Sequence, residues 1–282
     1  MNVVCLNGEF LPAEEARVSI FDRSFLYGDG LFETLRVYGG HPFAWTEHLD
    51  RLERSAGWMG LRMPTTRDIL RSTSLELLRR NGQSEALLRI QISRGQGRRG
   101  YSPRGAESPV WVVTTHPATP QDPARPTRWR LATASLRLAV SDPLNQRKSS
   151  SKLLQVLARA EAESQGSDEA LLLDTAGEVV EGSSSNVFWI AGRRLLTPPV
   201  GSGALPGITR DAVLRIAPEL GFIPDESRCT PEDLRAADGV FLTLSSLELV
   251  TATALDGTAL RESPGTRVLH EAYQRRTRSG PH

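Results

Sequence analysis

The chain has 282 residues, of which 39% are hydrophobic and 24% charged, and this composition is ordinary for a globular protein with room for two domains. Its formal net charge of +1 gives no overall attraction to nucleic acid or to a membrane surface. The first ten residues lack the basic start and apolar core of a signal peptide, and no apolar run is long enough to span a bilayer. We therefore expect a cytoplasmic protein with neither a nucleic-acid nor a membrane partner.

The first 116 residues alternate strand and helix patterns and predict a small α/β domain. We expect strands at 2–6, 31–38, 41–45, 86–93 and 109–115, a helix that starts with Thr46 as its N-cap, and a second helix over 66–80. Residues 117–126 contain four prolines and no apolar periodicity, which is typical of a stiff linker between domains.

The remaining residues, 127–282, predict a larger domain of the same α/β class. Strands are expected at 129–138, 169–173, 178–180, 186–190, 240–244 and 248–253, and helices at 151–165, 209–220 and 265–276. The polar tail after the last helix is expected to be disordered. The two cysteines, Cys5 and Cys229, lie far apart, so neither a disulfide framework nor a metal site is predicted.

The scarcity of lysine points to amine chemistry. Only Lys148 and Lys152 are lysines among the 34 basic residues, and the others are arginines. A deprotonated lysine amine can form a Schiff base, whereas a guanidinium cannot. The alternative is that two lysines remain by chance at the start of a solvated helix.

The context of Lys148 adds to this interpretation. Lys148 follows a loop and precedes a helix, where burial can keep part of its amine neutral. Glu181 comes directly after a strand and opens the run Glu-Gly-Ser-Ser-Ser-Asn. A carboxylate placed against a pyridine nitrogen keeps that nitrogen protonated, and the protonated ring then accepts electrons.

Two further segments could bind a phosphate. Gly207-Ile208-Thr209-Arg210 has the form of a helix N-terminus, whose free N–H groups favour anions, and the Thr209 hydroxyl adds a donor. Ser245 and Ser246 follow a strand and offer two more hydroxyls. Each segment alone is more often a helix cap or a loop, so the order and spacing of the segments carry the argument.

Taken together, these segments make the chain resemble the fold-type IV, or class IV aminotransferase, enzymes that depend on pyridoxal 5'-phosphate. The matching text covers nearly the whole chain and consists of FDRSFLYGDGLFETLRVY (21–38), EHLDRL (47–52), ISRGQGRRGYS (92–102), DEALLLD (168–174), EGSSSNVFWI (181–190), LLTPPV (195–200) and LPGITR (205–210). The resemblance implies a two-domain fold like that of D-amino acid aminotransferase, with a small N-terminal α/β domain and a larger, β-barrel-like C-terminal domain with helices.

The resemblance also implies roles for individual residues. Lys148 corresponds to the catalytic Schiff-base lysine, Glu181 to the partner of the pyridine nitrogen, and Arg51 to the arginine that grips the cofactor phosphate. The remaining cofactor-binding positions implied in this way are Ser185, Asn186, Gly207, Ile208, Thr209, Ser245 and Ser246. The substrate-binding positions are Phe32, Arg99 and Tyr101, and no metal is implied.

For the loop 94–104, the resemblance favours Arg99 as a partner of a substrate carboxylate, while Arg94 and Arg98 are predicted to be merely solvated. The implied partners are a small amino or carboxylate substrate and a second copy of the chain. Members of the family bind the cofactor between their domains and work as homodimers whose small-domain loops complete the neighbouring site.

Three features favour 4-amino-4-deoxychorismate lyase, which releases pyruvate and forms 4-aminobenzoate in the folate pathway. The loop GRRGYS resembles the lyase pattern, and Tyr101 stands where D-amino acid aminotransferases have histidine. Phe32 stands where those aminotransferases have tyrosine, and residues 244–247 (LSSL) replace the Gly-Thr-Ala segment of branched-chain enzymes.

Aminotransferases remain the alternative, acting on D-amino acids or branched-chain amino acids and passing the amino group to a 2-oxo acid. Residues 149–152 depart from the lyase pattern, which more often has asparagine or tyrosine there, and the pair Phe32-Glu33 also occurs in aminotransferases. An amine transaminase and a catalytically silent cofactor-binding protein are weaker alternatives, and the intact set of Lys148, Glu181 and Arg51 argues against the silent protein.

Overall fold

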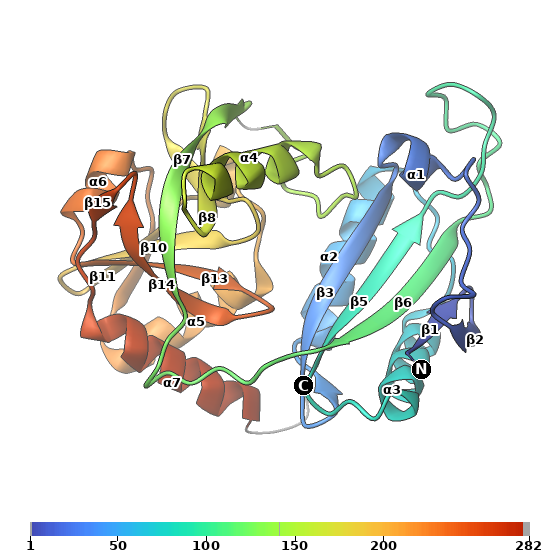
Figure 1. The fold of residues 1–282 in the computed structure, drawn as a ribbon, viewed down its shortest axis with the longest axis horizontal. Coiled ribbons are helices and arrows are strands. Elements are labelled where there is room, and N and C mark those ends of the chain that lie inside the picture. The colour runs from blue at the N-terminus through green and yellow to red at the C-terminus, as the bar shows by residue number, and fades with distance from the viewer. Residues whose placement is uncertain (1, 141, 279–282) are drawn as a thin grey trace. The chain divides into compact units, whose positions relative to one another are not determined.

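The computed structural model describes residues 2–140 and 142–278, which form two compact units, each built on its own sheet (Figure 1). The N-terminal unit extends to Pro120 and also includes Arg147–Lys152, although this segment lies far along the chain. Both units combine helices with a sheet, so the predicted α/β class is confirmed. The domain boundaries predicted from the sequence, 1–116, 117–126 and 127–282, divide the chain differently and stay a prediction.

The N-terminal unit is a six-stranded antiparallel sheet with the order β2-β1-β6-β5-β3-β4. Its elements are β1 (Val3–Leu6), β2 (Glu9–Pro12), α1 (Arg23–Tyr27), β3 (Gly30–Tyr38), β4 (His41–Pro42), α2 (Trp45–Trp58), α3 (Arg67–Arg80), β5 (Ala86–Ser93) and β6 (Val110–Pro117). Helices α2 and α3 cover one face of this sheet (Figure 1).

Alternation along β3 determines which side chains reach the helices. Leu31, Leu35 and Val37 are fully buried and pack with Leu49 and Leu52 of α2. Because successive side chains of a strand point to opposite faces, Phe32 lies on the other face of the sheet. The core of this unit therefore fixes the direction in which a candidate site residue points.

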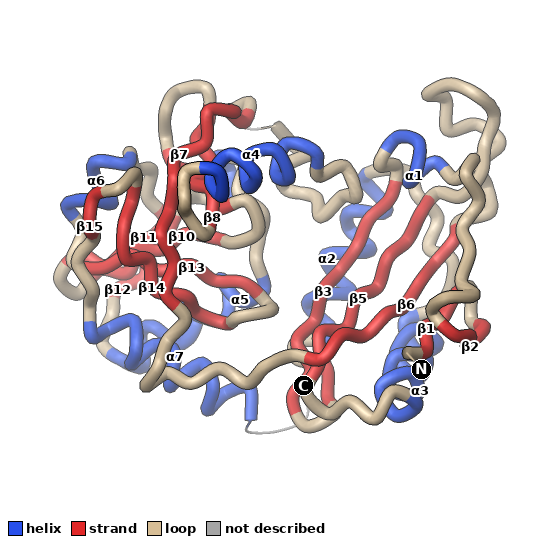
Figure 2. The backbone as a smooth tube through the Cα atoms, in the orientation of Figure 1, coloured by secondary structure: helices blue, strands red, loops and turns tan. Residues whose placement is uncertain are grey.

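The C-terminal unit contains a nine-stranded mixed sheet with the order β12-β11-β10-β13-β14-β7-β8-β9, and β15 pairs with β14. Its elements are β7 (Arg128–Leu138), α4 (Leu153–Ser164), β8 (Glu169–Asp174), β9 (Val179–Gly182), β10 (Asn186–Ala191), β11 (Arg194–Thr197), α5 (Ile208–Ile216), β12 (Ile223–Glu226), α6 (Pro231–Ala236), β13 (Gly239–Leu244), β14 (Glu248–Leu255), β15 (Thr258–Ala259) and α7 (Pro264–Arg278), with two 3-10 turns at Val200–Ser202 and Ala217–Leu220. Figure 2 shows the helices of this unit around the outside of its strands.

Strand β8 packs against apolar side chains on both of its faces. Leu171 and Leu173 of β8 join a large core on one face, whereas Ala170 and Leu172 pack with α4 on the other. Every residue of β8 is buried, including the acidic residues at its two ends, Glu169 and Asp174. Two carboxylates therefore lie in the interior and require hydrogen-bond donors.

Most predicted elements are present, and the differences have local causes. Helix α2 begins at Trp45 with Ala44 as a left-handed N-cap (φ 52°), so the predicted Thr46 cap is wrong and the preceding strand shrinks to His41–Pro42. The predicted helix 209–220 ends at Ile216 and continues as a 3-10 turn because Pro218 cannot donate a helical hydrogen bond. Short elements without periodicity were not predicted, namely β2, α1, β11, β12, α6 and β15.

The predicted disordered tail lies mostly outside the described residues. Within residues 2–140 and 142–278, no helix combines the length and the apolar character needed to cross a membrane.

Candidate active site

The segment that carries Lys148 pairs with the start of β3. The backbone N–H of Phe32 donates to the carbonyl oxygen of Lys148 (N···O 2.9 Å), and the N–H of Ser150 donates to the carbonyl oxygen of Gly30 (2.8 Å). Leu31 and Ser149 form the bridge between these two bonds. This pairing places Lys148 in the N-terminal unit, beside Phe32.

Glycine at position 30 makes this close approach possible. A Cβ atom on Gly30 would lie 2.6 Å from the carbonyl oxygen of Ile92 and 3.2 Å from the hydroxyl of Ser150. Gly28 has φ +68°, and a Cβ there would lie 2.9 Å from the Cα of Ser151. The motif Tyr-Gly-Asp-Gly therefore has a steric reason, because a side chain at Gly28 would meet the backbone of the segment that carries Lys148 and a side chain at Gly30 would meet β5.

The ring of Phe32 is within contact distance of an amine and of a guanidinium. Lys148 Nζ is 4.9 Å from the ring centroid, and the guanidinium carbon of Arg89, on β5, is 3.8 Å from it. Arg89 donates to the Oε1 of Gln91 (3.1 Å from Nη2) and forms no salt bridge with any described residue. Burial lowers the pKa of Arg89, but a guanidinium stays cationic at neutral pH. A partly buried positive charge thus lacks an anionic partner within the part of the chain that the structure describes.

On the opposite face of β3, three buried side chains form an ion-pair cluster. Glu33 accepts from Arg51 through both oxygens (Nε···Oε1 2.8 Å and Nη2···Oε2 2.6 Å), and Nδ1 of His48 lies 2.7 Å from its Oε2. Burial alone would raise the pKa of Glu33, but the charge and hydrogen bonds of Arg51 and the hydrogen bond of His48 hold that pKa at about 2. Arg51 is therefore fixed by Glu33, and its predicted contact with a phosphate stays a prediction.

In the C-terminal unit, Glu181 and Asn186 both bind Leu205. Glu181, near the end of β9, accepts from the backbone N–H of Leu205 (N···Oε2 2.8 Å), and the side-chain amide of Asn186 donates to the carbonyl oxygen of the same residue (2.9 Å). The hydroxyl of Ser185 points to Glu169, at 3.4 Å from its Oε2. The predicted roles of Glu181, Ser185 and Asn186 toward a cofactor are untested by this geometry.

The predicted phosphate-binding segments lie at the same end of this sheet. Gly207 is the N-cap of α5 and supplies no side-chain cap, so the first N–H groups of Ile208 and Thr209 are offered to an anion. A Cβ on Gly207 would lie 1.9 Å from the Oδ1 of Asn186, which explains the glycine. Asn186 pairs with Thr243, and Ser245 and Ser246 form the turn just beyond it.

The loop after β5 corrects one expectation. Arg94 was predicted to be solvated, but it is buried and donates through Nε to Asp29 (2.8 Å to Oδ2) and through its other nitrogens to the carbonyl oxygens of Met59 and Gly60 (2.9 Å each). Arg94 therefore fixes the base of the loop.

The two predicted substrate residues of this loop are exposed. Arg99 lies on the surface, and Tyr101 is 86% exposed with its ring edge against Tyr27, 5.5 Å between centroids. Arg23 holds this part of the loop by donating to the carbonyl oxygens of Gly100, Tyr101 and Ser102. Within this chain they do not join the group around Phe32, so their role stays a prediction.

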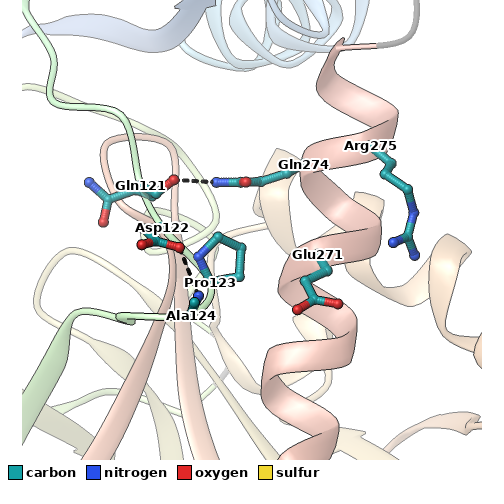
Figure 3. A pocket seen from close by; sticks show the side chains of 7 residues that line it. All are labelled: Gln121, Asp122, Pro123, Ala124, Glu271, Gln274 and Arg275. Atoms are coloured by element: carbon teal, nitrogen blue, oxygen red, sulfur yellow. Dashed lines mark hydrogen bonds between the residues drawn. The ribbon is translucent and has the colours of Figure 1, made fainter.

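A separate cavity of about 520 Å³ lies in the C-terminal unit and contains none of the predicted site residues. Figure 3 shows that it lies beside α7 and is crossed by the hydrogen bond from the side chain of Gln274 to the carbonyl oxygen of Gln121 (2.8 Å). The lining residues are Gln121, Asp122, Pro123, Ala124, Glu271, Gln274 and Arg275. The described residues contain no group of three or more His, Cys, Asp or Glu side chains that could hold a metal ion.

The sequence analysis missed Glu33, His48, Arg89 and Glu169. The strand periodicity contained a signal for two of them. In β3 the charged Glu33 occupies a core-facing position between Leu31 and Leu35, and a charge there requires a buried partner. In β5, Arg89 occupies a position that alternates with the buried Leu88 and Ile90, so it shares the face of Phe32.

Comparison with known proteins supplies the family. Residues 30–255 match the family described as amino-transferase class IV. The chain belongs to this family. A protein of Methanocaldococcus jannaschii provisionally named a branched-chain-amino-acid aminotransferase is 39% identical over 258 residues, which are 90% of this chain and 88% of that protein.

Solved structures agree with this class IV assignment. The branched-chain aminotransferase of the archaeon Thermoproteus uzoniensis, solved with norvaline, superimposes with a TM-score of 0.90 at 32% identity, over 97% of this chain and 93% of that one. The branched-chain amino acid aminotransferase of Escherichia coli superimposes with a TM-score of 0.92 at 28% identity, over 100% of this chain and 96% of that one. The predicted two-domain aminotransferase fold is thereby confirmed.

The lyase prediction has weaker support than its alternative. The aminodeoxychorismate lyase of Bacillus subtilis is 29% identical, over 90% of this chain and 87% of the relative, compared with 39% for the M. jannaschii protein. These class IV relatives thus favour the aminotransferase that the sequence analysis placed second.

Burial of His48 predicts a pH-dependent stability. Burial lowers the pKa of His48, the bond to Glu33 opposes this shift, and the charges of Arg51 and Lys148 add to it. Because the unfolded chain binds the proton more readily, stability should fall as the pH drops below about 6.5, the ordinary histidine value. We expect His48→Asn, which keeps a donor toward Glu33, to lose less stability than the wild type between about pH 7.5 and pH 5.5.

Thermal unfolding of both proteins across this range provides the measurement. Glu33 stays ionised there because its pKa is about 2, so the difference between the two curves reports His48. Parallel curves would show that His48 titrates alike in the folded and unfolded chain.

Proposed function

We propose that this chain is a pyridoxal 5'-phosphate-dependent aminotransferase that moves the amino group of a branched-chain amino acid to a 2-oxo acid. The observation that carries the proposal is the shared contact of Lys148 and Arg89 with the ring of Phe32. This arrangement puts the amine of Lys148 on the same aromatic side chain as the Arg89 guanidinium, and Arg89 forms no salt bridge with any described residue, which suits a substrate with an amino group and a carboxylate. Membership in the class IV family and the branched-chain relatives support it.

The residues present fit the cofactor. The N-terminus of α5 has no side-chain cap, and in the same unit the hydroxyl of Thr243 is buried without a hydrogen-bond partner among the described residues. Buried hydroxyls and free helix N–H groups are donors that a phosphate uses. When bound, pyridoxal 5'-phosphate supplies an aldehyde for the amine and a ring that accepts electrons.

Lys148 is the residue we assign to covalent binding and to proton transfer. In its neutral form the amine is a nucleophile that would bind the cofactor aldehyde. When a substrate amine has displaced it, the free Nζ can take a proton from the α-carbon of the substrate and pass it to a carbon of the cofactor. The backbone pairing with Gly30 and Phe32 holds its main chain, so only the side chain needs to move. Lys152, four positions later, has no place in this mechanism.

Glu181 is assigned to the pyridine nitrogen of the cofactor. Its Oε2 is already bound by the N–H of Leu205, so its carboxylate has a defined orientation. The N–H groups of Ile208 and Thr209 and the hydroxyls of Thr209 and Ser246 are assigned to the phosphate. These assignments come from the predicted motif and from the uncapped start of α5.

Arg89 is assigned to a carboxylate of the substrate. A planar guanidinium binds a carboxylate through two hydrogen bonds, and Arg89 retains donors that Gln91 does not use. Bidentate binding would also compensate the charge that burial leaves unpaired. This role was predicted for Arg99, which is exposed.

Two copies of the chain are proposed to associate. Ile20, Phe21 and Phe25 are each more than 60% exposed (68%, 64% and 74%), and they lie within six residues of the chain, in and just before α1. Large apolar side chains exposed so close together in the sequence favour a protein–protein contact. Sedimentation velocity should show one species of twice 30.9 kDa, and Phe25→Glu should shift it toward the monomer. A wild-type monomer would contradict this assignment.

A half-reaction experiment tests the proposed function. Purified protein with bound cofactor is mixed with L-leucine, D-alanine or aminodeoxychorismate, and the amine form of the cofactor and the 2-oxo acid product are measured. We expect L-leucine to react, Lys148→Ala to lose the visible absorbance of the lysine-bound cofactor and to slow the reaction by about 10⁴-fold, and Lys152→Ala to keep both.

Other results would replace the proposal. Release of pyruvate and 4-aminobenzoate from aminodeoxychorismate, with no reaction of amino acids, would establish the lyase instead. Reaction with D-alanine but not with L-leucine would show that the substrates are D-amino acids. Loss of the absorbance in Lys152→Ala but not in Lys148→Ala would show that Lys152, and not Lys148, binds the cofactor.

Substitution of Arg89 tests the carboxylate assignment. A hydrogen bond to a charged group contributes about 1.5–3 kcal/mol, so Arg89→Gln should raise KM for the amino acid by about 10-fold to 100-fold. Arg89→Lys should have a smaller effect because the charge remains while the fork is lost. If both variants lower only the thermal stability and leave KM unchanged, Arg89 packs on Phe32 without binding substrate.

A further inference from the structure

Glu169 is a fully buried carboxylate that the proposed mechanism does not use. It lies at the start of β8 and accepts from the backbone N–H groups of Ala170 (2.9 Å to Oε1) and Ser183 (3.1 Å to Oε1). The hydroxyls of three consecutive serines, Ser183, Ser184 and Ser185, also donate to it. A carboxylate with this many donors is satisfied without leaving the interior.

The loop is wrapped tightly around this carboxylate. A Cβ on Gly182 would lie 2.2 Å from the hydroxyl of Ser185 and 3.3 Å from the Cγ of Glu169, so the backbone passes too close for a side chain. The N–H of Gly182 donates to the carbonyl oxygen of Ser185 (2.7 Å), and the N–H of Ser183 also reaches the carbonyl oxygen of Ala170 (3.1 Å). The position of residues 182–185 is thus set by Glu169 and its strand.

Both ends of this loop hold Leu205. Glu181 precedes the loop and accepts from the N–H of Leu205, while Asn186 follows it and donates to the carbonyl oxygen of Leu205. Leu205 lies just before Gly207, the N-cap of α5. A shift of the loop would therefore move Glu181 and the uncapped start of α5 together.

We propose that Glu169 is a positioning residue for the cofactor site: by anchoring the serine loop it fixes the carboxylate of Glu181 and the N-terminus of α5. The proposal rests on the function proposed above. It also assigns Ser185, which the sequence analysis associated with the cofactor, to the loop anchor together with Ser183 and Ser184. The serine hydroxyls of this triplet are directed to Glu169.

The experiment compares Glu169→Gln with Asp174→Asn. Asp174 is the buried acid at the other end of β8, where its Oδ1 accepts from the N–H groups of Ala176 and Glu178, so it controls for the loss of any buried carboxylate. Hydrogen exchange of residues 182–186 in cofactor-free protein is the first measurement. We expect exchange to accelerate in Glu169→Gln and to stay at the wild-type rate in Asp174→Asn.

The second measurement is the pH titration of the visible absorbance of the bound cofactor. Glu169→Gln should shift it and lower kcat by about 10-fold to 100-fold, the range found for residues that orient a ligating side chain. In a Glu181→Gln background, Glu169→Gln should cause a smaller further shift of the titration, because the part of its effect that passes through Glu181 is already lost and only the part that passes through α5 remains. If the titration shift of the double variant equals the sum of the shifts of the two single variants, the proposal is overturned.

The outcomes separate the two proposals. A wild-type protein that binds no cofactor overturns the proposed function, while the exchange measurement still decides whether Glu169 anchors the loop. Equal exchange in Glu169→Gln and Asp174→Asn overturns the anchor itself. If Glu169→Gln does not fold, the double variant Ser183→Ala with Ser184→Ala removes the anchor from the loop side, and it must give the same shift for the proposal to stand.

Discussion

The backbone pairing between the Lys148 segment and the start of β3 is the constraint on which the rest of the candidate site depends. Two hydrogen bonds, Phe32 N–H to Lys148 and Ser150 N–H to Gly30, join parts of the chain more than a hundred positions apart. Such a contact carries a large ordering cost, so it persists only where the surrounding packing supports it. The close approach itself is possible because Gly28 and Gly30 carry no side chain that would clash with Ser151 or with Ile92.

Two buried carboxylates then organise the surroundings in different ways. Glu33 is neutralised by a cation, since Arg51 grips both of its oxygens. Glu169 is satisfied mainly by neutral donors from a serine loop, and the nearest guanidinium nitrogen that pairs with it, of Arg159, is 3.7 Å away. Burying a charge is unfavourable unless hydrogen bonds or an opposite charge satisfy it. Each carboxylate therefore holds its partners in place, because losing one of them would leave a buried charge unsatisfied. The first fixes an arginine, and the second fixes a loop.

Periodicity predicted the long elements because their apolar faces repeat, as in β3, β5 and α3, whose bounds match within a residue. Motifs also pointed to Lys148, Glu181 and the start of α5. The sequence could not show that Arg94 is buried or that Arg99 is exposed, because both are arginines in one polar loop. Only the fold brings the partners of Arg94, which are Asp29 and the carbonyl oxygens of Met59 and Gly60, next to it. Likewise, the choice between lyase and aminotransferase depended on loop residues that carry no periodic signal.

The scarcity of lysine has a practical consequence for work with this protein. Both ε-amines of the chain stand within five consecutive positions of a single segment, and both are partly covered. Apart from an N-terminal amine, reagents that couple to primary amines, including those used for biosensor immobilisation or fluorescent tagging, will therefore react only within this segment, where Lys148 lies beside the Phe32 ring. Attachment through an engineered surface cysteine leaves that segment unmodified.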